Sequence, residues 1–444
     1  MIKFIKSLYF HQLFYFYITV LSATFLLSFW FSMLFTVATL LTFIFAIVLL
    51  LDLLLVFRSE NGTQAKRNVA DKLSNSDENE IILEFQNNFP FKTYLTVIDE
   101  IPFQFQKRDF LEKITLQKEE QRLLKYTVTP FERGEYHFGN LNLFVSSPLR
   151  IVAKRFQFDN EKMTAVYPSY IQMKKYEFLA MSNRLTELGL KKIRKIGHTM
   201  EFEQIKKYVS GDDVRTINWK TTAKKGKLMV NQYQDEKSQP IFSLIDVGRV
   251  MKMPFEELKL LDYAINSTLA FSNIALRKND KVGMLTFSKQ VENIVPASNK
   301  KTNLAVLNEV LYKIDTNYSD SDYGLLYGMI KRKITQRSLL ILYTNFEHMS
   351  GLERQLPYLK SIAKQHLLIT VFFENTELEE LISEDAENLQ AVYEKIIAQK
   401  FYYEKRLIVK ELEKHGIYSI LTKPKNLSVN VINKYLEFKS KGLI

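Results

Sequence analysis

The chain has 444 residues, enough for two or three domains with hydrophobic cores of their own. It contains no cysteine, which excludes disulfides, thiolate metal sites and a cysteine nucleophile. The formal net charge of +12 would suit a nucleic-acid partner, but the lysines are spread along the whole chain. A basic protein beside an anionic membrane surface needs no nucleic acid to explain its charge, so we expect no nucleic acid among the partners.

Residues 1–57 are predicted to form a hairpin of two transmembrane helices. No Lys, Arg, Asp or Glu occurs from Ser7 to Leu51, and one helical span needs about 20 apolar residues, so the run is long enough for two crossings. We place the helices at Gln12–Phe29 and Ser32–Phe57, with the amphipathic ring of Trp30 at the membrane–water interface between them. We do not expect a signal peptide, whose apolar core is much shorter, or a buried soluble pair, which would carry a polar stripe.

The charges that flank the two helices predict their orientation. The turn between the helices is uncharged, whereas the outer flanks are basic, with Lys3, Lys6, Arg58, Lys66 and Arg67. Because positive flanks stay on the cytoplasmic side, we expect both termini and all soluble domains in the cytoplasm. Asp52 is the one acid within the apolar stretch, and we expect it at the headgroup level rather than as a functional intramembrane carboxylate.

After the apolar hairpin, the chain is expected to form a linker and then a β-domain. Residues 58–77 are polar and lack an apolar period, which predicts the linker. Residues 78–170 alternate between apolar and polar side chains, with short strands expected at 81–85, 94–98, 123–128 and 141–145 and turn residues between them. Many short strands with frequent turns predict a β-sandwich.

Residues 236–444 show apolar strands that alternate with helices. The strands are expected at 241–245, 281–287, 338–343, 366–373 and 416–421, with a hairpin return at 290–294, and the helices at 254–276, 304–312, 323–334, 352–363, 389–412 and 429–438. This pattern predicts a doubly wound, mostly parallel sheet covered on both faces. We therefore expect a multidomain chain with a two-helix transmembrane hairpin, a β-sandwich and an α/β domain.

The connecting segment, residues 171–235, carries the most distinctive local chemistry. Gly211 permits a tight turn, and either Asp212 or Asp213 can cap the short helix that follows. Gly226 lies where a left-handed cap would end that helix. The residues after it, 228–230, are expected to begin a strand.

Two interpretations of this segment remain open from its residues alone. The paired acids together with Arg215, Asn218 and Lys220 could bind phosphate or a metal ion, which would make the chain an unrecognised hydrolase. Alternatively, Arg215 pairs with the acids inside a capped turn, and Trp219, the only tryptophan outside the apolar hairpin, anchors that turn. Neither spacing nor composition separates the two, and we favour the structural interpretation.

The segment resembles the signature of the bacterial family called domain of unknown function 58. The pattern E-F-x(5)-Y-x-x-G-D-x-x-R-x-I-x-W-x-x-x-A is reproduced by Glu201, Phe202, Tyr208, Gly211, Asp212, Arg215, Ile217, Trp219 and Ala223, with Asp213 and Lys220 inside it. The family often has Asp where this chain has Asn218, and Arg where it has Lys224. Its R-G-x-Y-x-F-G stretch is matched by residues 133–139.

The resemblance implies two transmembrane helices, a β-sandwich and a C-terminal domain similar to the von Willebrand factor type A fold. It also implies a place in the bacterial inner (plasma) membrane. Such proteins are commonly encoded beside AAA+ ATPases of the MoxR class and are thought to assist in maturing or assembling envelope or metabolic complexes. We therefore expect a scaffold or interaction protein whose partners are the lipid bilayer, a MoxR-type ATPase and other membrane or envelope proteins.

A von Willebrand factor type A domain often holds Mg²⁺ on a D-x-S-x-S loop, together with a Thr and an Asp from two further loops. Both serine positions are lost in this chain, where the aligned residues are Asp246, Gly248, Val250, Thr302 and Asn345. Mg²⁺ requires hard oxygen ligands, so we expect no functional metal site and no cofactor. The alternative is a Mg²⁺-dependent type A adhesion module.

The sequence lacks the common catalytic motifs. It contains no G-x-x-x-x-G-K-[ST] phosphate loop, H-E-x-x-H, G-x-S-x-G or G-x-G-x-x-G, and its six histidines are scattered without ligand spacing. We therefore expect no catalytic residues and no enzymatic activity.

Overall fold

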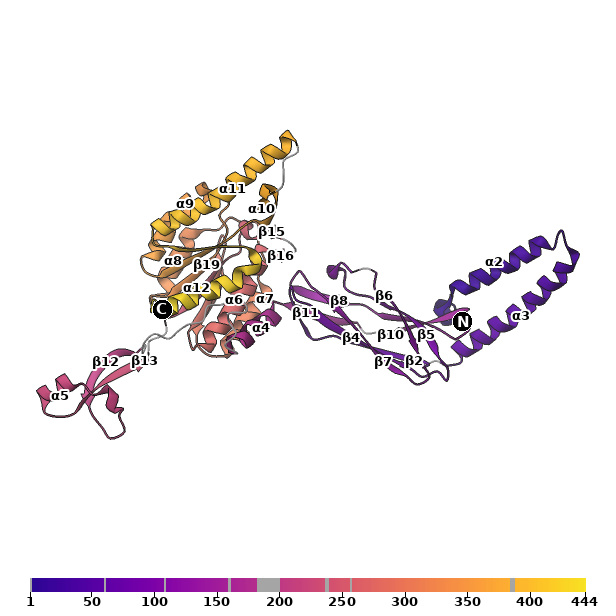
Figure 1. The fold of residues 1–444 in the computed structure, drawn as a ribbon, viewed down its shortest axis with the longest axis horizontal. Helices are drawn as coiled ribbons and strands as arrows, with labels where there is room; N and C mark the ends of the chain where they lie inside the picture. The colour runs from indigo at the N-terminus through magenta and orange to yellow at the C-terminus, as the bar shows by residue number, and fades with distance from the viewer. Residues whose placement is uncertain are drawn as a thin grey trace. The chain divides into compact units, whose positions relative to one another are not determined.

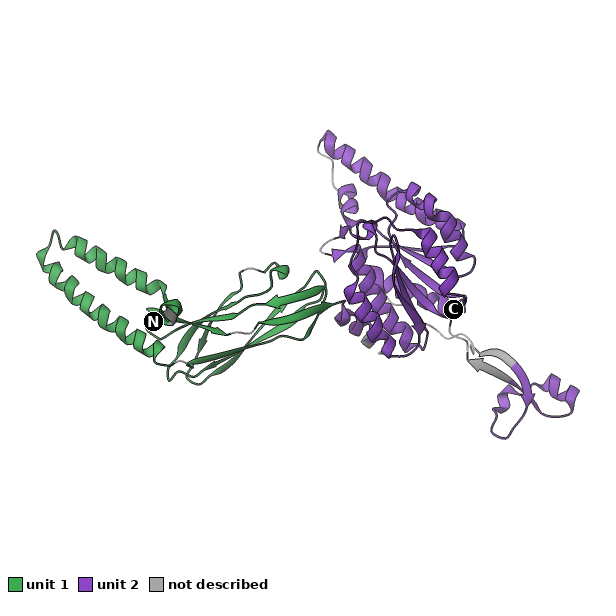
Figure 2. Ribbon diagram, turned by 180° about the vertical axis from the view of Figure 1, so that it is seen from behind, with its two compact units in different colours: residues 1–167 green, residues 168–444 purple. Residues whose placement is uncertain are grey.

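The computed structural model describes residues 2–59, 61–107, 109–158, 161–181, 200–235, 239–255, 258–383 and 388–444. The chain divides into two compact units, Met1–Tyr167 and Pro168–Ile444 (Figure 2). Each unit has an apolar core of its own, which is the mark of a domain. The prediction of a multidomain chain is confirmed.

Unit 1 begins with α1 (Ile2–Ser7) and the short strand β1 (Leu8–Phe10), followed by two apolar helices, α2 (Gln12–Leu27) and α3 (Ser32–Phe57). The two helices pack side by side (Figure 1), with the ring of Phe45 at a centroid distance of 5.9 Å from those of Phe14 and Tyr17. By length and composition α3 can cross a membrane, whereas α2 has only 16 residues. The helix α2 begins at the predicted Gln12 and ends at Leu27, two residues before the predicted end at Phe29.

The remainder of unit 1 is a β-domain in which three sheets share one core. The strand orders are β1-β10-β9-β5-β6, β2-β4-β7 and β3-β11-β8. Alternate residues of β4 and β5 are buried, as the two-residue period of their sequences requires. After β1, the strands are β2 (Thr63–Asn68), β3 (Lys72–Ser74), β4 (Asn79–Asn87), β5 (Thr93–Asp99), β6 (Leu111–Leu116), β7 (Gln121–Val128), β8 (Gly134–Phe138), β9 (Leu141–Ser146), β10 (Val152–Phe158) and β11 (Lys162–Tyr167), with a 3₁₀ turn at Phe103–Phe105.

The segment 58–77, expected to be a linker, contains strands β2 and β3. β2 is polar in sequence, yet it pairs with β4 along its whole length. Its Arg67 is buried. The burial of this charge is tolerated because the guanidinium lies 3.0 Å from the carboxylate of Asp99 and donates to the carbonyl of Gly139 at 2.6 Å. A strand held by backbone pairing and an ion pair to a distant residue has no apolar period, so its sequence is indistinguishable from that of a linker.

The R-G-E-Y-H-F-G stretch at residues 133–139 forms the core strand β8. Tyr136 and Phe138 are each 1% exposed, and the hydroxyl of Tyr136 donates to the carbonyl of Glu132 at 2.9 Å. Gly139 has no room for a side chain, because a Cβ there would lie 2.9 Å from that of Glu100. These residues therefore build the β-domain rather than a surface site.

Unit 2 contains a six-stranded sheet with the order β18-β17-β14-β19-β20-β21. Every neighbouring pair is parallel except β17 and β18, which form the expected hairpin. The strands are β14 (Ile241–Asp246), β17 (Val282–Phe287), β18 (Val291–Ser298), β19 (Leu339–Tyr343), β20 (Leu367–Phe373) and β21 (Tyr418–Thr422). The helices are α4 (Tyr170–Met181), α6 (Leu260–Arg277), α7 (Thr302–Lys313), α8 (Tyr323–Lys333), α9 (Met349–Ala363), α10 (Thr376–Ser383), α11 (Leu389–Lys414) and α12 (Leu427–Ser440), with 3₁₀ turns at Arg249–Met251 and Pro424–Asn426.

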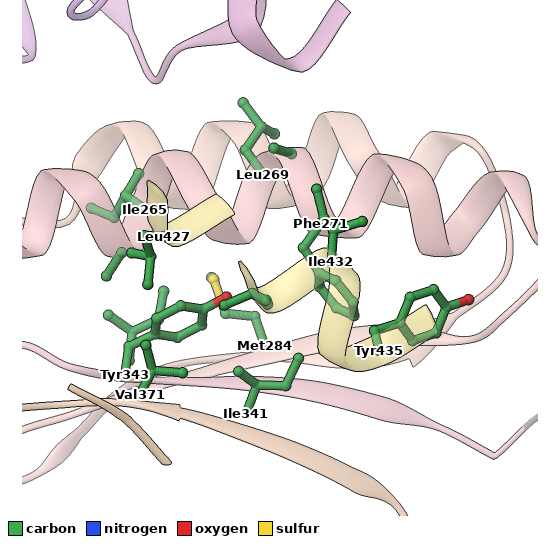
Figure 3. Close-up of a cluster of buried hydrophobic side chains, with 14 of the residues drawn as sticks. Ile265, Leu269, Phe271, Met284, Ile341, Tyr343, Val371, Leu427, Ile432 and Tyr435 are labelled. Carbon is green, nitrogen blue, oxygen red and sulfur yellow. The ribbon is translucent and has the colours of Figure 1, made fainter. Parts of the chain in front are cut away.

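Apolar side chains pack on both faces of this sheet, as predicted for a doubly wound fold. On one face, Tyr343 and Val371 pack with residues of α6 and α12 (Figure 3). On the other face, Leu340 and Leu342 share a core with side chains of α8, α9 and α11. Fully burying one aliphatic side chain stabilises the fold by about 1.5–3 kcal/mol, so both faces select apolar residues and the strands become continuous apolar runs.

Two element boundaries in unit 2 differ from the prediction. Pro254 was expected in the first turn of a helix, but it lies in the short strand β15 (Pro254–Phe255), which pairs with β16 (Leu258–Lys259), and α6 begins only after them. Unit 2 also starts before the predicted residue 236 and includes α4. Glu177 of α4 accepts a hydrogen bond from Asn273 at 2.8 Å and pairs with Arg277, both on α6. These contacts make α4 part of the domain rather than of a connecting segment.

Candidate functional site

The signature residues lie in an antiparallel hairpin of β12 (Met200–Lys207) and β13 (Met229–Asp235) (Figure 1). Among the strands that the structure describes, these two pair only with each other. Glu201 and Phe202 lie in β12, opposite Gln234 and Tyr233, and their side chains lie outside the described part of the structure. The remaining signature residues follow β12 in the connection between the strands, so they share one local structure.

The connection begins with a tight turn. The backbone N–H of Tyr208 donates to the carbonyl of Leu228 at 2.9 Å and closes the hairpin. Gly211 follows with φ of 110°, a conformation that strains any residue with a Cβ. Asp212 fixes the turn by accepting from the backbone N–H of Val209 at 3.0 Å and from the Lys206 ammonium at 2.9 Å. The predicted turn at Gly211 is therefore present.

Two caps then order the rest of the connection. The side chain of Asp213 accepts from the backbone N–H of Arg215 at 2.9 Å and caps a 3₁₀ turn, Val214–Thr216. The helix α5 (Trp219–Lys225) has a different cap, Asn218, which accepts from Thr221 N–H at 3.0 Å. Gly226 ends α5 with φ of 64°, which is the left-handed cap predicted from the sequence.

The side chain of Asn218 has a second contact that an aspartate could not make. Its amide nitrogen donates to Oδ1 of Asn231 on β13 at 2.9 Å, so Asn218 caps α5 and also ties that helix to the strand. An aspartate has no donor to offer in its ionised form. The departure from the family pattern at this position is thus matched by a polar partner on the facing strand.

Two expectations for this segment are wrong. The expected ion pair between Arg215 and the acids is not formed among the described residues, because Asp212 pairs with Lys206 and Asp213 with backbone. Trp219, expected to anchor the turn, is 69% exposed. Val209 and Val214 are each 62% exposed on the same connection. A hairpin of two strands has no core of its own in which a tryptophan could be buried.

The geometry of the acids favours a structural role over a catalytic one. The backbone N–H of Val209, and then the Lys206 ammonium, lower the pKa of Asp212 below its ordinary value. A general base works best with a pKa near the operating pH, so a lowered pKa makes Asp212 a poor proton acceptor. Lys220 is exposed, and Asp213 is used as a cap. These contacts build a rigid turn that carries exposed apolar and basic side chains.

The second candidate site lies at the carboxyl ends of the parallel strands in unit 2. The strand order reverses between β14 and β19, and a crevice at such a reversal is where open α/β sheets bind ligands. Asp246 ends β14 and is fully buried. It accepts from the backbone N–H of Gly248 at 2.9 Å, from the Thr344 hydroxyl at 2.8 Å and from the Ser321 hydroxyl.

A short chain of hydroxyls completes the surroundings of Asp246. The hydroxyl of Tyr323 lies 2.7 Å from that of Thr344 and donates to the carboxylate of Asp246 at 3.4 Å. Burial raises the pKa of Asp246, and burial together with the nearby Asp246 charge raises that of Tyr323. Sequence analysis missed Ser321 and Tyr323, although their place just before and at the start of the expected helix 323–334 was a usable signal.

Thr302, the expected threonine of a metal site, lies at the other end of the sheet. β18 runs antiparallel to β17, so its last residue, Ser298, pairs with Val282 at the beginning of β17. The neighbouring Asn303 donates to the carbonyl of Val282 at 2.7 Å. Asp246, by contrast, pairs with Phe287 at the end of β17. The reversal of the chain in β18 thus separates Thr302 from Asp246.

The residues around Asp246 do not fit a Mg²⁺ site. Asn345 follows β19 as expected, but its side-chain oxygen accepts from the ammonium of Lys405 on α11. A Cβ on Gly248 would lie 2.9 Å from the carbonyl of Ser319 and closer still to the hydroxyl of Ser321. The loop before α8 therefore fills the space that a serine side chain would need. One carboxylate, already hydrogen-bonded, and an oxygen bound to a cation are a poor ligand set for Mg²⁺.

Comparison of the sequence with protein families finds similarity over the middle of the chain. A family described as "Protein of unknown function DUF58" matches residues 204–386. This range includes most of the signature hairpin and every strand of the six-stranded sheet except β21. The uncharacterized protein YeaD of Bacillus subtilis (strain 168) is 25% identical over 175 residues, 39% of this chain and 41% of the relative. The chain thus spans about two fifths of the length of the curated relative that it matches.

Three solved structures with similar backbones each cover less than half of this chain. The hypothetical protein BatB from Bacteroides thetaiotaomicron has a TM-score of 0.32 and 13% identity, with 46% of this chain and 99% of BatB covered. The VWA domain of SpRpn10 has a TM-score of 0.28 and 12% identity, with 44% and 93% covered. The CARDB domain of a Pyrococcus furiosus protein has a TM-score of 0.17 and 14% identity, with 24% and 94% covered. The family match, and not these structural neighbours, confirms the resemblance predicted from the signature, as similarity of residues 204–386 to the DUF58 family.

Proposed function

We propose that this chain is a membrane-anchored, non-enzymatic interaction protein whose β12–β13 hairpin presents a docking surface to another protein. The observation that carries the proposal is the exposure of Trp219, Val209 and Val214 on a connection that is otherwise tightly ordered. We call residues 206–228 the hairpin tip. Exposed apolar side chains on a rigid, separately paired hairpin gain stability when a partner covers them.

The rigidity of the tip supports a role in recognition. Asp213, Asn218 and Gly226 satisfy the ends of the 3₁₀ turn and of α5, so the positions of the exposed side chains are fixed before a partner arrives. A partner then does not have to order the loop, which would cost conformational entropy. Tryptophan is also enriched among the residues that contribute most to protein interfaces.

The charge of the tip indicates the kind of partner. The tip contains two acids, Asp212 and Asp213, and seven basic residues: Lys206, Lys207, Arg215, Lys220, Lys224, Lys225 and Lys227. Asp212 is already paired with Lys206, so the surplus is positive. Complementary charge speeds encounter and selects partners, so the matching surface is an apolar pocket with an acidic rim.

The N-terminal helices serve as the membrane anchor in this proposal. The segment Ser32–Leu51 of α3 contains about 20 residues and, at about 1.5 Å per residue, measures roughly 30 Å, the thickness of the hydrocarbon core. Asp52 follows and is buried against the β-domain, where it accepts from the backbone N–H groups of Ile151 and Val152 at 2.9 and 2.8 Å. Asp52 would then mark the point where α3 leaves the bilayer.

Orientation and partner complete the proposal. The basic flanks of the two helices support a cytoplasmic location of both termini, the β-domain and unit 2 at a bacterial inner membrane. The family resemblance supports a MoxR-type AAA+ ATPase as the protein that docks on the tip, in the maturation or assembly of other complexes. Protease added to inverted vesicles should digest the soluble domains, whereas protease added to intact spheroplasts should leave them untouched; the reverse pattern would overturn the orientation.

Affinity purification in mild detergent tests the docking surface. The full-length protein should co-purify with a MoxR-type ATPase identified by mass spectrometry, and Trp219→Ala should reduce the recovered ATPase at least tenfold. Tyr393→Ala is the matched control, since Tyr393 is 61% exposed on α11, away from the tip in sequence. Equal recovery with Trp219→Ala and wild type would refute the docking surface. Absence of any such ATPase from the wild-type sample would refute the partner.

A further inference from the structure

A cavity of about 230 Å³ lies in unit 2 at the carboxyl end of the sheet. Its walls are mostly apolar and come from separate elements, with Phe373 at the end of β20, Leu421 in β21, Phe401 on α11 and Phe255 in β15. An apolar cavity of roughly 150 Å³ can hold benzene, so this one has room for a single ring with a small substituent.

A lysine forms the polar end of the cavity. The ammonium of Lys405 donates to Oδ1 of Asn345, which lies two residues after the end of β19. An ammonium has three donors, and this contact uses one. Within the part of the chain that the structure describes, Lys405 forms no ion pair. Burial lowers the pKa of Lys405 to about 8, against the opposing effect of Glu347.

Two acids, Glu347 and Glu374, also line the cavity, and among the described residues neither forms an ion pair with Lys405. Glu347 is exposed. Glu374 acts on Lys423, whose pKa its charge helps to raise after the larger effect of Glu379. Glu404 lies beside the cavity residue His348, at 3.2 Å from its Nδ1. Lys405 is half-buried, and a partly desolvated cation without a paired carboxylate is costly, so a ligand that brings the counter-charge lowers that cost.

We propose that this cavity binds a small carboxylic acid with an apolar body, such as a monocyclic aromatic acid, whose carboxylate pairs with the ammonium of Lys405. The ring occupies the apolar walls, and the carboxylate reaches the remaining donors of the lysine. The location agrees with this role, because ligands of open parallel sheets bind outside the carboxyl ends of the strands. The inference is independent of the hairpin tip and of any protein partner.

Isothermal titration of the full-length protein in detergent with benzoate and with benzamide tests the proposal. The two probes have the same ring and differ in charge, so benzoate should bind at least ten times more tightly. Lys405→Met keeps an apolar side chain of similar length and should weaken benzoate binding at least tenfold. Lys410→Met, at an exposed position of α11, is the matched control and should leave binding unchanged.

A second measurement locates the ligand. Met253 lines the cavity, so its ¹³C-labelled methyl resonance should shift when benzoate is added, and Met253→Leu assigns that resonance. Equal affinity for benzoate and benzamide, an unchanged affinity in Lys405→Met, or an unshifted Met253 resonance at saturation would each overturn the proposal. Failure of benzoate to bind at millimolar concentration would overturn it as well. The comparison of the two probes on the wild type decides the question even if Lys405→Met fails to fold.

Discussion

Replacing Asp52 by alanine should loosen the contact between α3 and the β-domain. Asp52 is fully buried, and its carboxylate accepts from the backbone N–H groups of Ile151 at 2.9 Å and Val152 at 2.8 Å and from the hydroxyl of Ser147. These partners follow Asp52 by nearly a hundred residues, so the carboxylate joins the apolar helix to the loop between β9 and β10. Alanine leaves both amides without their acceptor.

The size of the effect follows from the chemistry of these bonds. A hydrogen bond to a charged group contributes about 1.5–3 kcal/mol, and a buried donor left unsatisfied costs about 1–3 kcal/mol. For two amides we expect Asp52→Ala to lower the local free energy of opening by about 3–6 kcal/mol. Because about 1.4 kcal/mol corresponds to a factor of ten, amide exchange at Ile151 and Val152 should accelerate by roughly 10²–10⁴.

Hydrogen exchange of the full-length protein in detergent micelles measures this directly. Peptides that contain Ile151 and Val152 should exchange faster in Asp52→Ala and by an intermediate amount in Asp52→Asn, which keeps an acceptor oxygen but loses the charge. Asp71→Ala is the control, because the side chain of Asp71 is 92% exposed where it pairs with Lys162. Acceleration of less than about tenfold in Asp52→Ala would show that the carboxylate does not hold this loop.

Three further predictions concern buried positions. Gly248→Ala should destabilise unit 2 by about 1–3 kcal/mol, because its Cβ would lie 2.9 Å from the carbonyl of Ser319, whereas Gly328→Ala, with open space around it in α8, should be neutral or stabilising in the same thermal melt. Burial raises the pKa of Asp246 above its unfolded value, so the folded state binds this proton more tightly and loses stability as the pH rises through the raised pKa. Asp246→Asn should therefore flatten the pH dependence of the free energy of unfolding above about pH 4. Parallel curves for the variant and the wild type would contradict this. Arg67→Met should lower the free energy of unfolding, measured by urea denaturation, by about 3–5 kcal/mol, because it leaves the carboxylate of Asp99 buried without the guanidinium. The double variant Arg67→Met with Asp99→Leu should regain much of that loss. A single variant as stable as the wild type would argue against a structural ion pair.

Several features were predictable because their signals are local. The apolar runs of α3 and of strands such as β14 and β20 follow from composition over a few residues, and the two-residue period of β4 and β5 follows from one buried face. The left-handed cap at Gly226 needs only the neighbouring backbone, since glycine alone adopts that conformation without strain. The similarity of residues 204–386 to the DUF58 family was also visible in the order of a few side chains.

Other features depend on which distant segments meet, and the sequence carries no local mark of that. The sequence of β2 resembles that of a linker because the strand is held by the backbone of β4 and by the carboxylate of Asp99 rather than by apolar side chains of its own. Thr302 was expected beside Asp246, but β18 reverses the chain and leaves Thr302 at the other end of the sheet. The hydroxyl that donates to Asp246 comes instead from Ser321, in a loop whose position the sequence does not mark.

Trp219 and Lys405 illustrate the same limit for the two candidate sites. Whether a tryptophan anchors a turn depends on a core beneath it, and the hairpin provides none among its described residues. Whether a lysine on a helix faces water or an apolar cavity depends on how that helix packs against the ends of β20 and β21. The sequence by itself thus determined the apolar segments and the left-handed cap at Gly226, and the tertiary structure decided burial, pairing and neighbourhood, because these quantities arise only when remote parts of the chain come into contact.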